Sequence, residues 1–141
     1  MPRVEKSAIV RRAPDVVWSF LTERENAPLY VPGLVRVWDV RPKAPGVGRT
    51  WRFEYKLLEL PLEGTARMAA FESGRSFEFV TETALKSHWT YELSPSGSDT
   101  RVQVILDYAL PDSLPFSRTV EQVRDARMSE LLRNLAARLE C

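Results

Sequence analysis

Cysteine and histidine are nearly absent from the 141 residues. Cys141 is the only cysteine and the last residue, so no disulfide can form within the chain and we expect no structured thiol nucleophile. His88 is the only histidine. With so few ligands and no carboxylate cluster at ligand spacing, we expect neither a metal site nor a cofactor. No Ser-His-Asp or Cys-His arrangement can be assembled with support from the sequence.

Long apolar runs and clusters of one charge are also missing. No run approaches membrane-spanning length, and the start MPRVEKSAIV lacks the apolar segment of a signal peptide, so we expect a cytoplasmic protein without a membrane span. The formal net charge is +1, and no Lys/Arg run favours nucleic acid as a partner. Gly46 and Gly48 lead into a strand and lack the longer glycine fingerprint, so they predict a turn and not a phosphate loop.

What the chain does contain is typical of one globular domain spanning residues 1–141. Hydrophobic residues make up 44% and charged residues 28%. No linker, internal repeat or low-complexity segment divides the sequence. We expect a monomer or a homodimer.

Alternation of apolar and polar residues dominates from Leu34 to Leu110. Turn signals divide this region into six predicted strands, at about 34–41, 49–60, 62–71, 75–84, 87–94 and 100–110. Arg3–Arg11 predicts a seventh strand ahead of them. Short connections favour an antiparallel meander. The pattern leaves the inner faces of the first two strands, 3–11 and 34–41, unassigned.

Each of the later strands has one apolar and one polar face. The polar faces carry His88, Asp107 and Glu54, for which we expect surface positions. The apolar faces are rich in rings: Trp51, Phe53, Tyr55, Phe77, Phe79, Trp89, Tyr91 and Tyr108.

The segment APDVVWSFLTERENAPLYVPGL (Ala13–Leu34) begins as a helix and is then interrupted. Pro14 fits a first helical turn, whereas Pro28, Pro32 and Gly33 prevent a long continuation. The interrupted part still carries Leu29, Tyr30 and Val31. We interpret these three residues as a lid and cavity wall more than as central core.

A helix of roughly 25 residues is predicted after residue 115, because the apolar period changes to 3.6 there. Its apolar stripe comprises Phe116, Val120, Val123, Met128, Leu131, Leu135 and Leu139. One helix cannot cover the whole concave face of a seven-stranded sheet curled around it. The space that remains predicts a cavity.

We therefore predict a ligand site with aromatic walls and one charged anchor. Any single ring could belong to an ordinary core, but the set is too large for one helix to cover. The predicted ligand-binding residues are Tyr30, Trp51, Phe53, Tyr55, Met68, Phe77, Phe79, Trp89, Tyr91, Tyr108 and Arg127.

Arg124 and Arg127 both fall within the apolar stripe of the last helix. They could reach solvent and pair with Glu121 and Glu130, or place a guanidinium at the cavity edge. A charge in the stripe is costly unless it reaches water or an anion. We predict Arg127 as the anchor, facing a ligand oxygen together with Tyr91 or Tyr108.

The sequence resembles the START-like, helix-grip superfamily, also called SRPBCC, and within it the polyketide cyclase/dehydrase-type proteins. The resemblance rests on APDVVWSFLTE, N-x-P-x-Y-V-P-G-L (26–34), G-x-G-x-x-W (46–51), W-x-Y-x-L (89–93), G-S-D-T-R-V-x-V (97–104) and the amphipathic C-terminal helix. Quinone-binding members are similar through Y-V-P-G near Tyr30 and L-D-Y near Tyr108.

This resemblance implies an α+β fold: a seven-stranded antiparallel sheet curled around a long C-terminal helix, with two short helices after the first strand. It also implies an apolar pocket between sheet and helix. Three functions remain open: a binding protein for a small hydrophobic molecule, a cyclase/dehydrase-type enzyme, or a quinone- or lipid-handling module that acts with a protein partner.

Overall fold

The computed structural model describes residues 3–57, 59–82, 86–109 and 117–140. Its elements, in chain order, are β1 (Arg3–Val10), α1 (Pro14–Thr22), the 3-10 helix η1 (Arg24–Leu29), β2 (Leu34–Arg41), β3 (Thr50–Leu57), β4 (Leu60–Glu72), β5 (Ser76–Thr81), β6 (Ser87–Ser96), β7 (Asp99–Tyr108) and α2 (Ser117–Glu140). Phe116 and Cys141, as well as the side chain of Val120, lie outside what the structure describes.

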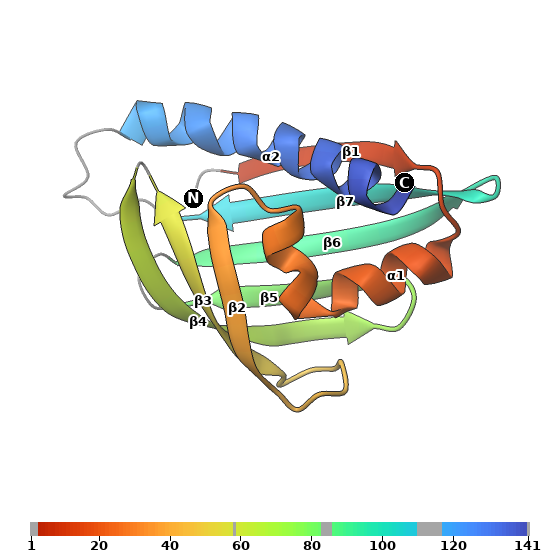
Figure 1. Cartoon of the computed structure of the whole chain (residues 1–141), viewed down its shortest axis with the longest axis horizontal. Coiled ribbons are helices and arrows are strands. Elements are labelled where there is room, and N and C mark those ends of the chain that lie inside the picture. Colours follow the sequence, from red (N-terminus) through yellow and green to blue (C-terminus); the bar gives the residue numbers. More distant parts are fainter. Residues whose placement is uncertain (1–2, 58, 83–85, 110–116, 141) are drawn as a thin grey trace.

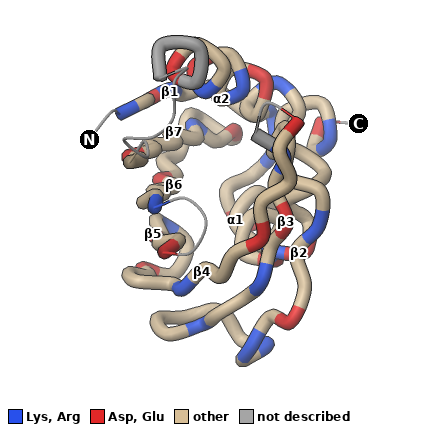
Figure 2. The backbone as a smooth tube through the Cα atoms, turned by 90° about the vertical axis from the view of Figure 1, so that its left-hand side faces the viewer, with Lys and Arg blue, Asp and Glu red and all other residues tan. Residues whose placement is uncertain are grey.

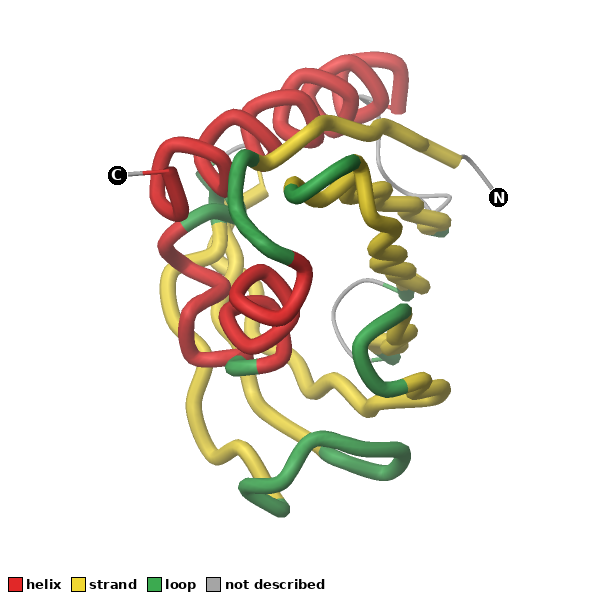
Figure 3. Tube along the Cα trace, turned by 90° about the vertical axis from the view of Figure 1, so that its right-hand side faces the viewer, coloured by secondary structure: helices red, strands yellow, loops and turns green. Residues whose placement is uncertain are grey.

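The strands form one antiparallel sheet in the order β1-β7-β6-β5-β4-β3-β2. Strands β2 to β7 are the predicted meander, and β1 joins its far edge beside β7. The sheet curls strongly, so that α1 and η1 lie inside its curve while α2 runs along β1 (Figures 1 and 3). The predicted α+β helix-grip architecture is confirmed.

The interrupted segment folds into two short helices, as predicted. Pro14 stands in the first turn of α1, and Asp15 provides a negative charge near the positive helix start. Val17 and Leu21 are fully buried. The backbone becomes extended at Glu23, and η1 follows with Pro28 inside it. This change of direction places η1 against β2, inside the curve of the sheet.

Bulges in β2 explain why its inner face could not be read from the sequence. The pairing with β3 shifts register between Leu34 and Arg36 and again between Trp38 and Arg41. Each shift moves the next side chains to the other face. As a result Leu34, Val37 and Val40 all pack toward the core, although a spacing of three residues would put neighbours on opposite faces of a regular strand. In β1, Val4 and Val10 are the buried residues.

Arg49 connects the loop after β2 to the end of α1. Its Nε donates to the Pro42 carbonyl (3.1 Å), Nη1 to the Thr22 carbonyl (2.7 Å) and Nη2 to the Lys43 carbonyl (2.9 Å). All three nitrogens of the buried guanidinium are therefore used inside the protein.

In the view of Figure 2, Lys and Arg positions are mixed with Asp and Glu positions along the backbone. In the part of the chain that the structure describes, no helix is long and apolar enough to cross a membrane.

Candidate functional site

The main cavity lies between the concave face of the sheet, the segment after η1 and α2. About 60 Å³ is open to the centre of a water-sized sphere, whereas one water needs roughly 10–15 Å³ by the same measure. The lining is mostly apolar and contains no acidic residue: Arg24, Val31, Leu34, Val37, Trp51, Phe53, Tyr55, Leu62, Phe79, Thr81, Ser87, Trp89, Tyr91 and Arg124.

Strand register builds an aromatic wall on β5 and β6. Phe79 pairs with Trp89 and Phe77 with Tyr91 across the two strands. The rings of each pair are nearly parallel, with centroids 5.9 Å and 5.0 Å apart. Trp51 of β3 meets Phe79 edge-on at 5.1 Å. Such ring contacts are favourable and fix the orientation of the rings within the wall.

Arg24 brings a charge to the inner end of this wall. It is only 2% exposed although it carries a full positive charge. Its Nη1 donates to the Leu21 carbonyl (3.1 Å) and to the Tyr30 hydroxyl (3.0 Å). The guanidinium carbon lies 4.8–5.6 Å from the centroids of four rings: Trp51, Phe77, Phe79 and Tyr91. Contacts with ring faces partly compensate the charge.

Arg124 of α2 brings a second buried charge to the same cavity. Its guanidinium carbon lies 5.1 Å from the Tyr55 centroid and 5.3 Å from that of Tyr108. Its Nη1 makes a long hydrogen bond of 3.4 Å to the Tyr55 hydroxyl. Burial lowers the pKa of Arg124, and the nearby charge of Arg127 lowers it further. The surroundings therefore destabilise the charged form of Arg124, and a neighbouring anion would stabilise it.

Arg127 lies next to the main cavity and not in its lining. Its Nη1 donates to the Tyr55 hydroxyl (2.8 Å) and to the Lys56 carbonyl (2.8 Å). A Cβ at Gly33 would come within 2.5 Å of this nitrogen, and Gly33 has a φ of 86°. Only glycine suits this close approach and backbone conformation. Arg127 therefore connects α2 to β3 and to the segment before β2.

Arg127 lines a small side cavity of about 10 Å³, which shares Val31, Tyr55, Trp89 and Arg124 with the main one.

Two phenols lie beside Arg24 in the interior. Burial raises the pKa of both Tyr30 and Tyr91, with Arg24 acting in the opposite direction. Both hydroxyls are therefore protonated at neutral pH and can donate. Tyr30 accepts from Arg24, whereas the Tyr91 hydroxyl has no hydrogen-bond partner of acceptable geometry, although Arg24 and Tyr30 are its polar neighbours.

Apart from Arg127, which lines only the side cavity, the structure divides the sequence-predicted ligand residues into two groups. Six are in the cavity lining: Trp51, Phe53, Tyr55, Phe79, Trp89 and Tyr91. Tyr30, Met68, Phe77 and Tyr108 are buried but are not among the lining residues. Strand parity identifies the inner face of the sheet, but it cannot tell which part of that face the helices cover. Leu29, which we interpreted as lid or wall, is 46% exposed and does not line the cavity.

Sequence reasoning missed the charged lining residue Arg24. Other lining residues outside the predicted ligand set are Val31, which was interpreted as cavity wall, and Leu34, Val37, Leu62, Thr81, Ser87 and Arg124. A signal for Arg24 was present, because Val17, Leu21 and Arg24 follow one another at helical spacing and the first two are core residues. Arg124 likewise continues the spacing of Met128, Leu131 and Leu135. The alternative pairing of Arg124 with Glu121 is not formed: the buried guanidinium has only Tyr55 as a hydrogen-bond partner among the described residues.

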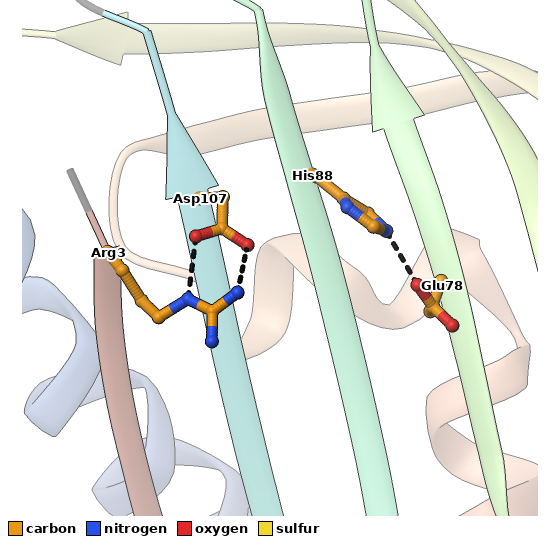
Figure 4. Close-up of polar contacts among 4 residues, drawn as sticks. All are labelled: Arg3, Glu78, His88 and Asp107. Atoms are coloured by element: carbon orange, nitrogen blue, oxygen red, sulfur yellow. Dashed lines mark hydrogen bonds and ion pairs between the residues drawn. The ribbon is translucent and has the colours of Figure 1, made fainter. Parts of the chain in front are cut away.

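The outer face of the sheet carries the titratable groups that parity had placed there (Figure 4). His88 Nε2 lies 2.7 Å from a Glu78 oxygen on the neighbouring strand. Arg3 Nε donates to Asp107 at 2.7 Å, and this hydrogen bond lowers the pKa of Asp107. These groups cannot serve the cavity. Within the described ranges, no group of three or more His, Cys, Asp or Glu residues is placed to hold a metal ion.

Fold and cavity together define a helix-grip protein with an internal, largely aromatic pocket. Its sequence matches the profile of the family described as "Polyketide cyclase / dehydrase and lipid transport" over residues 1–140. The chain therefore belongs to this family. No curated protein matches the sequence significantly.

Solved structures match over nearly the whole chain at low sequence identity. A protein from Thermus thermophilus has a TM-score of 0.82 at 18% identity, covering 98% of this chain and 97% of its own. A START superfamily protein from Mycobacterium smegmatis has a TM-score of 0.81 at 16% identity, with coverage of 98% and 97%. The Zhui aromatase/cyclase from a Streptomyces species has a TM-score of 0.78 at 13% identity, with coverage of 99% and 93%. At such identities these matches establish the fold.

Proposed function

We propose that the protein binds one small, largely apolar molecule with an aromatic or polyketide-like body in the main cavity. The observation that carries the proposal is an internal space walled by stacked rings and supplied with a few polar groups. Ligand sites usually have this composition. Family membership supports the same class of ligand.

The shape of the cavity favours a flat ligand. The rings of Phe79, Trp89 and Tyr91 lie within 20° of parallel to one another. A planar ring can stack on such a wall with little change in the protein. Because the open space is narrow, a molecule of polyketide size requires side chains such as Phe53 or Val37, which are only partly buried, to move outward.

A fluorescent neutral probe tests the proposal. N-phenyl-1-naphthylamine emits strongly in apolar surroundings, and we expect it to bind with a stoichiometry near one per chain. Leu62 lines the cavity from β4. Leu62→Trp places a large ring there, and it should weaken probe binding at least tenfold in a fluorescence titration.

Leu60→Trp is the matched control, because Leu60 lies on the same strand and is 54% exposed. It should leave probe affinity unchanged. If Leu62→Trp folds normally and binds the probe as tightly as the wild type, the probe lies elsewhere and the proposed function is wrong.

Catalysis of the cyclase or dehydrase type is the second candidate. The specific observation in its favour is that each arginine of the cavity lining is next to a phenol: Arg24 with Tyr30, and Arg124 with Tyr55. Such pairs could stabilise an enolate that forms on a bound poly-β-keto chain. Incubation with an unreduced polyketide substrate analogue separates the two functions. Conversion with multiple turnovers supports the enzyme, and stoichiometric retention of unchanged analogue supports the binding protein.

A further inference from the structure

Three buried side-chain atoms lack a hydrogen-bond partner in the described part of the molecule, and all three belong to residues of the main cavity. They are the Nε of Arg24, the Nε of Arg124 and the hydroxyl of Tyr91. Native proteins leave few buried polar atoms unsatisfied, and each exception calls for an explanation. Their concentration around one cavity points to something that the cavity binds.

Other arginines show how this protein normally satisfies a guanidinium. Arg49 is also buried, and each of its nitrogens donates to a backbone carbonyl. At the surface, Arg3 pairs with Asp107 and Arg11 with Glu140. Arg24 reaches one backbone carbonyl, that of Leu21, and its Nε stays without a partner. Among the described residues, no carboxylate forms an ion pair with Arg24 or Arg124.

The cavity therefore has two positive charges and no negative one in its lining. Burying a charge without a counter-charge is unfavourable in free energy, and contacts with ring faces compensate only part of this penalty. The pKa of Arg124 is lowered mainly by burial, as expected for a cation that lacks an anion. An anion that enters the cavity and lies beside a lining guanidinium group would form a charge-assisted hydrogen bond that the protein alone does not supply there.

We propose that the molecule bound in the main cavity is an organic anion, whose aromatic body packs against the aromatic lining and whose negatively charged group binds to the buried arginines of that lining, Arg124 and Arg24. The ligand class is thus an aromatic carboxylate, or an enolate or phenolate of similar shape. This proposal rests on the proposed function and assigns the charge of its ligand.

Two probes of the same shape test the charge separately from the cavity. 2-Naphthoate and 2-naphthamide share one ring system, and only naphthoate carries a negative charge at neutral pH. Isothermal titration calorimetry gives both affinities, and competition with N-phenyl-1-naphthylamine shows that both occupy the same site. In the wild type we expect naphthoate to bind at least tenfold more tightly than naphthamide.

Single substitutions show which arginine causes the preference for naphthoate over naphthamide. Arg124→Met and Arg24→Met keep much of the side-chain length and remove the charge, so each should reduce the preference for naphthoate to about threefold or less. Arg133→Met is the matched control, because Arg133 is exposed on the same helix as Arg124. It should retain the full preference. If Arg24→Met fails to fold, Arg124→Met and the wild-type comparison decide the matter.

The outcomes separate the two claims. Equal affinity of the wild type for both probes overturns the anionic ligand but leaves the proposed function standing. A preference that survives in Arg124→Met and is lost in Arg127→Met instead returns the anchor to the residue predicted from the sequence, and overturns the present assignment. If the dye binds in the cavity but neither probe displaces it, this inference fails and the proposed function stands. If the dye does not bind either, both fail.

Discussion

Arg24, Arg49 and Arg124 are the arginines buried in the described structure, at 2%, 4% and 5% exposure. They have the same charge and similar burial but different surroundings. Arg49 donates to two carbonyls of the loop after β2 and to one at the end of α1, and so contributes to folding. Arg124 is placed against ring faces beside an open cavity. Burying the Arg124 charge without a counter-charge lowers the stability of the protein. We infer that this charge serves binding, since sites built for a ligand are often suboptimal for stability.

This difference predicts opposite effects of the same substitution. Arg49→Met removes the donors of three carbonyls and should lower the free energy of unfolding by about 1–3 kcal/mol. Arg124→Met removes an uncompensated buried charge and should leave that free energy unchanged or raise it. Urea unfolding of both variants measures the effects. A loss in Arg124→Met as large as that in Arg49→Met would mean that Arg124 serves the fold.

The sequence was informative about single residues where strand parity applies. Trp51, Tyr55, Phe79 and Trp89 were placed on the inner face because alternation in β3, β5 and β6 is uninterrupted. Arg24 could not be placed in the same way, because its position depends on where α1 ends and η1 begins. The choice between Arg124 and Arg127 also failed to follow from the sequence, since both fall within the broad stripe of α2.

Among the elements, the interrupted segment after β1 has the largest influence on the site. A continuous helix would have carried Arg24 and Val31 onward along one axis. The break at Glu23 and the proline in η1 instead turn the chain, so that Arg24 meets the rings of β5 and β6 while Val31 forms part of the wall. The interruption could be predicted from the prolines and the two short helices from the family resemblance, whereas the angle between the helices depends on packing.

Helix α2 should contribute to stability through its buried leucines. Leu131 is 1% exposed, and Leu131→Ala should lower the free energy of unfolding by about 2–5 kcal/mol because it leaves a cavity in the core. Arg133→Ala, at an exposed position two residues later, is the control and should change it by less than about 0.5 kcal/mol. Chemical denaturation decides. Equal stability of the two variants would show that α2 is not packed as described.

At the scale of the whole molecule, the cavity exists because the concave face of the sheet is larger than the area that the helices cover. Seven strands curl around a concave face that α1, η1 and α2 cover only in part (Figures 1 and 3). This difference in area was predictable from the sequence, since the strands present more rings than one amphipathic helix can cover. The size of the remaining space was not, because it depends on how far Tyr30, Met68, Phe77 and Tyr108 fill the interior.

Native mass spectrometry of the freshly purified protein tests the central claim most directly. We predict that the wild-type chain carries one small organic molecule, or takes up one 2-naphthoate per chain on incubation, and that Leu62→Trp carries none. Wild-type protein that stays at its bare mass after incubation with 2-naphthoate and with N-phenyl-1-naphthylamine would contradict the account. So would equal retention by Leu62→Trp, because the ligand would then lie outside the cavity.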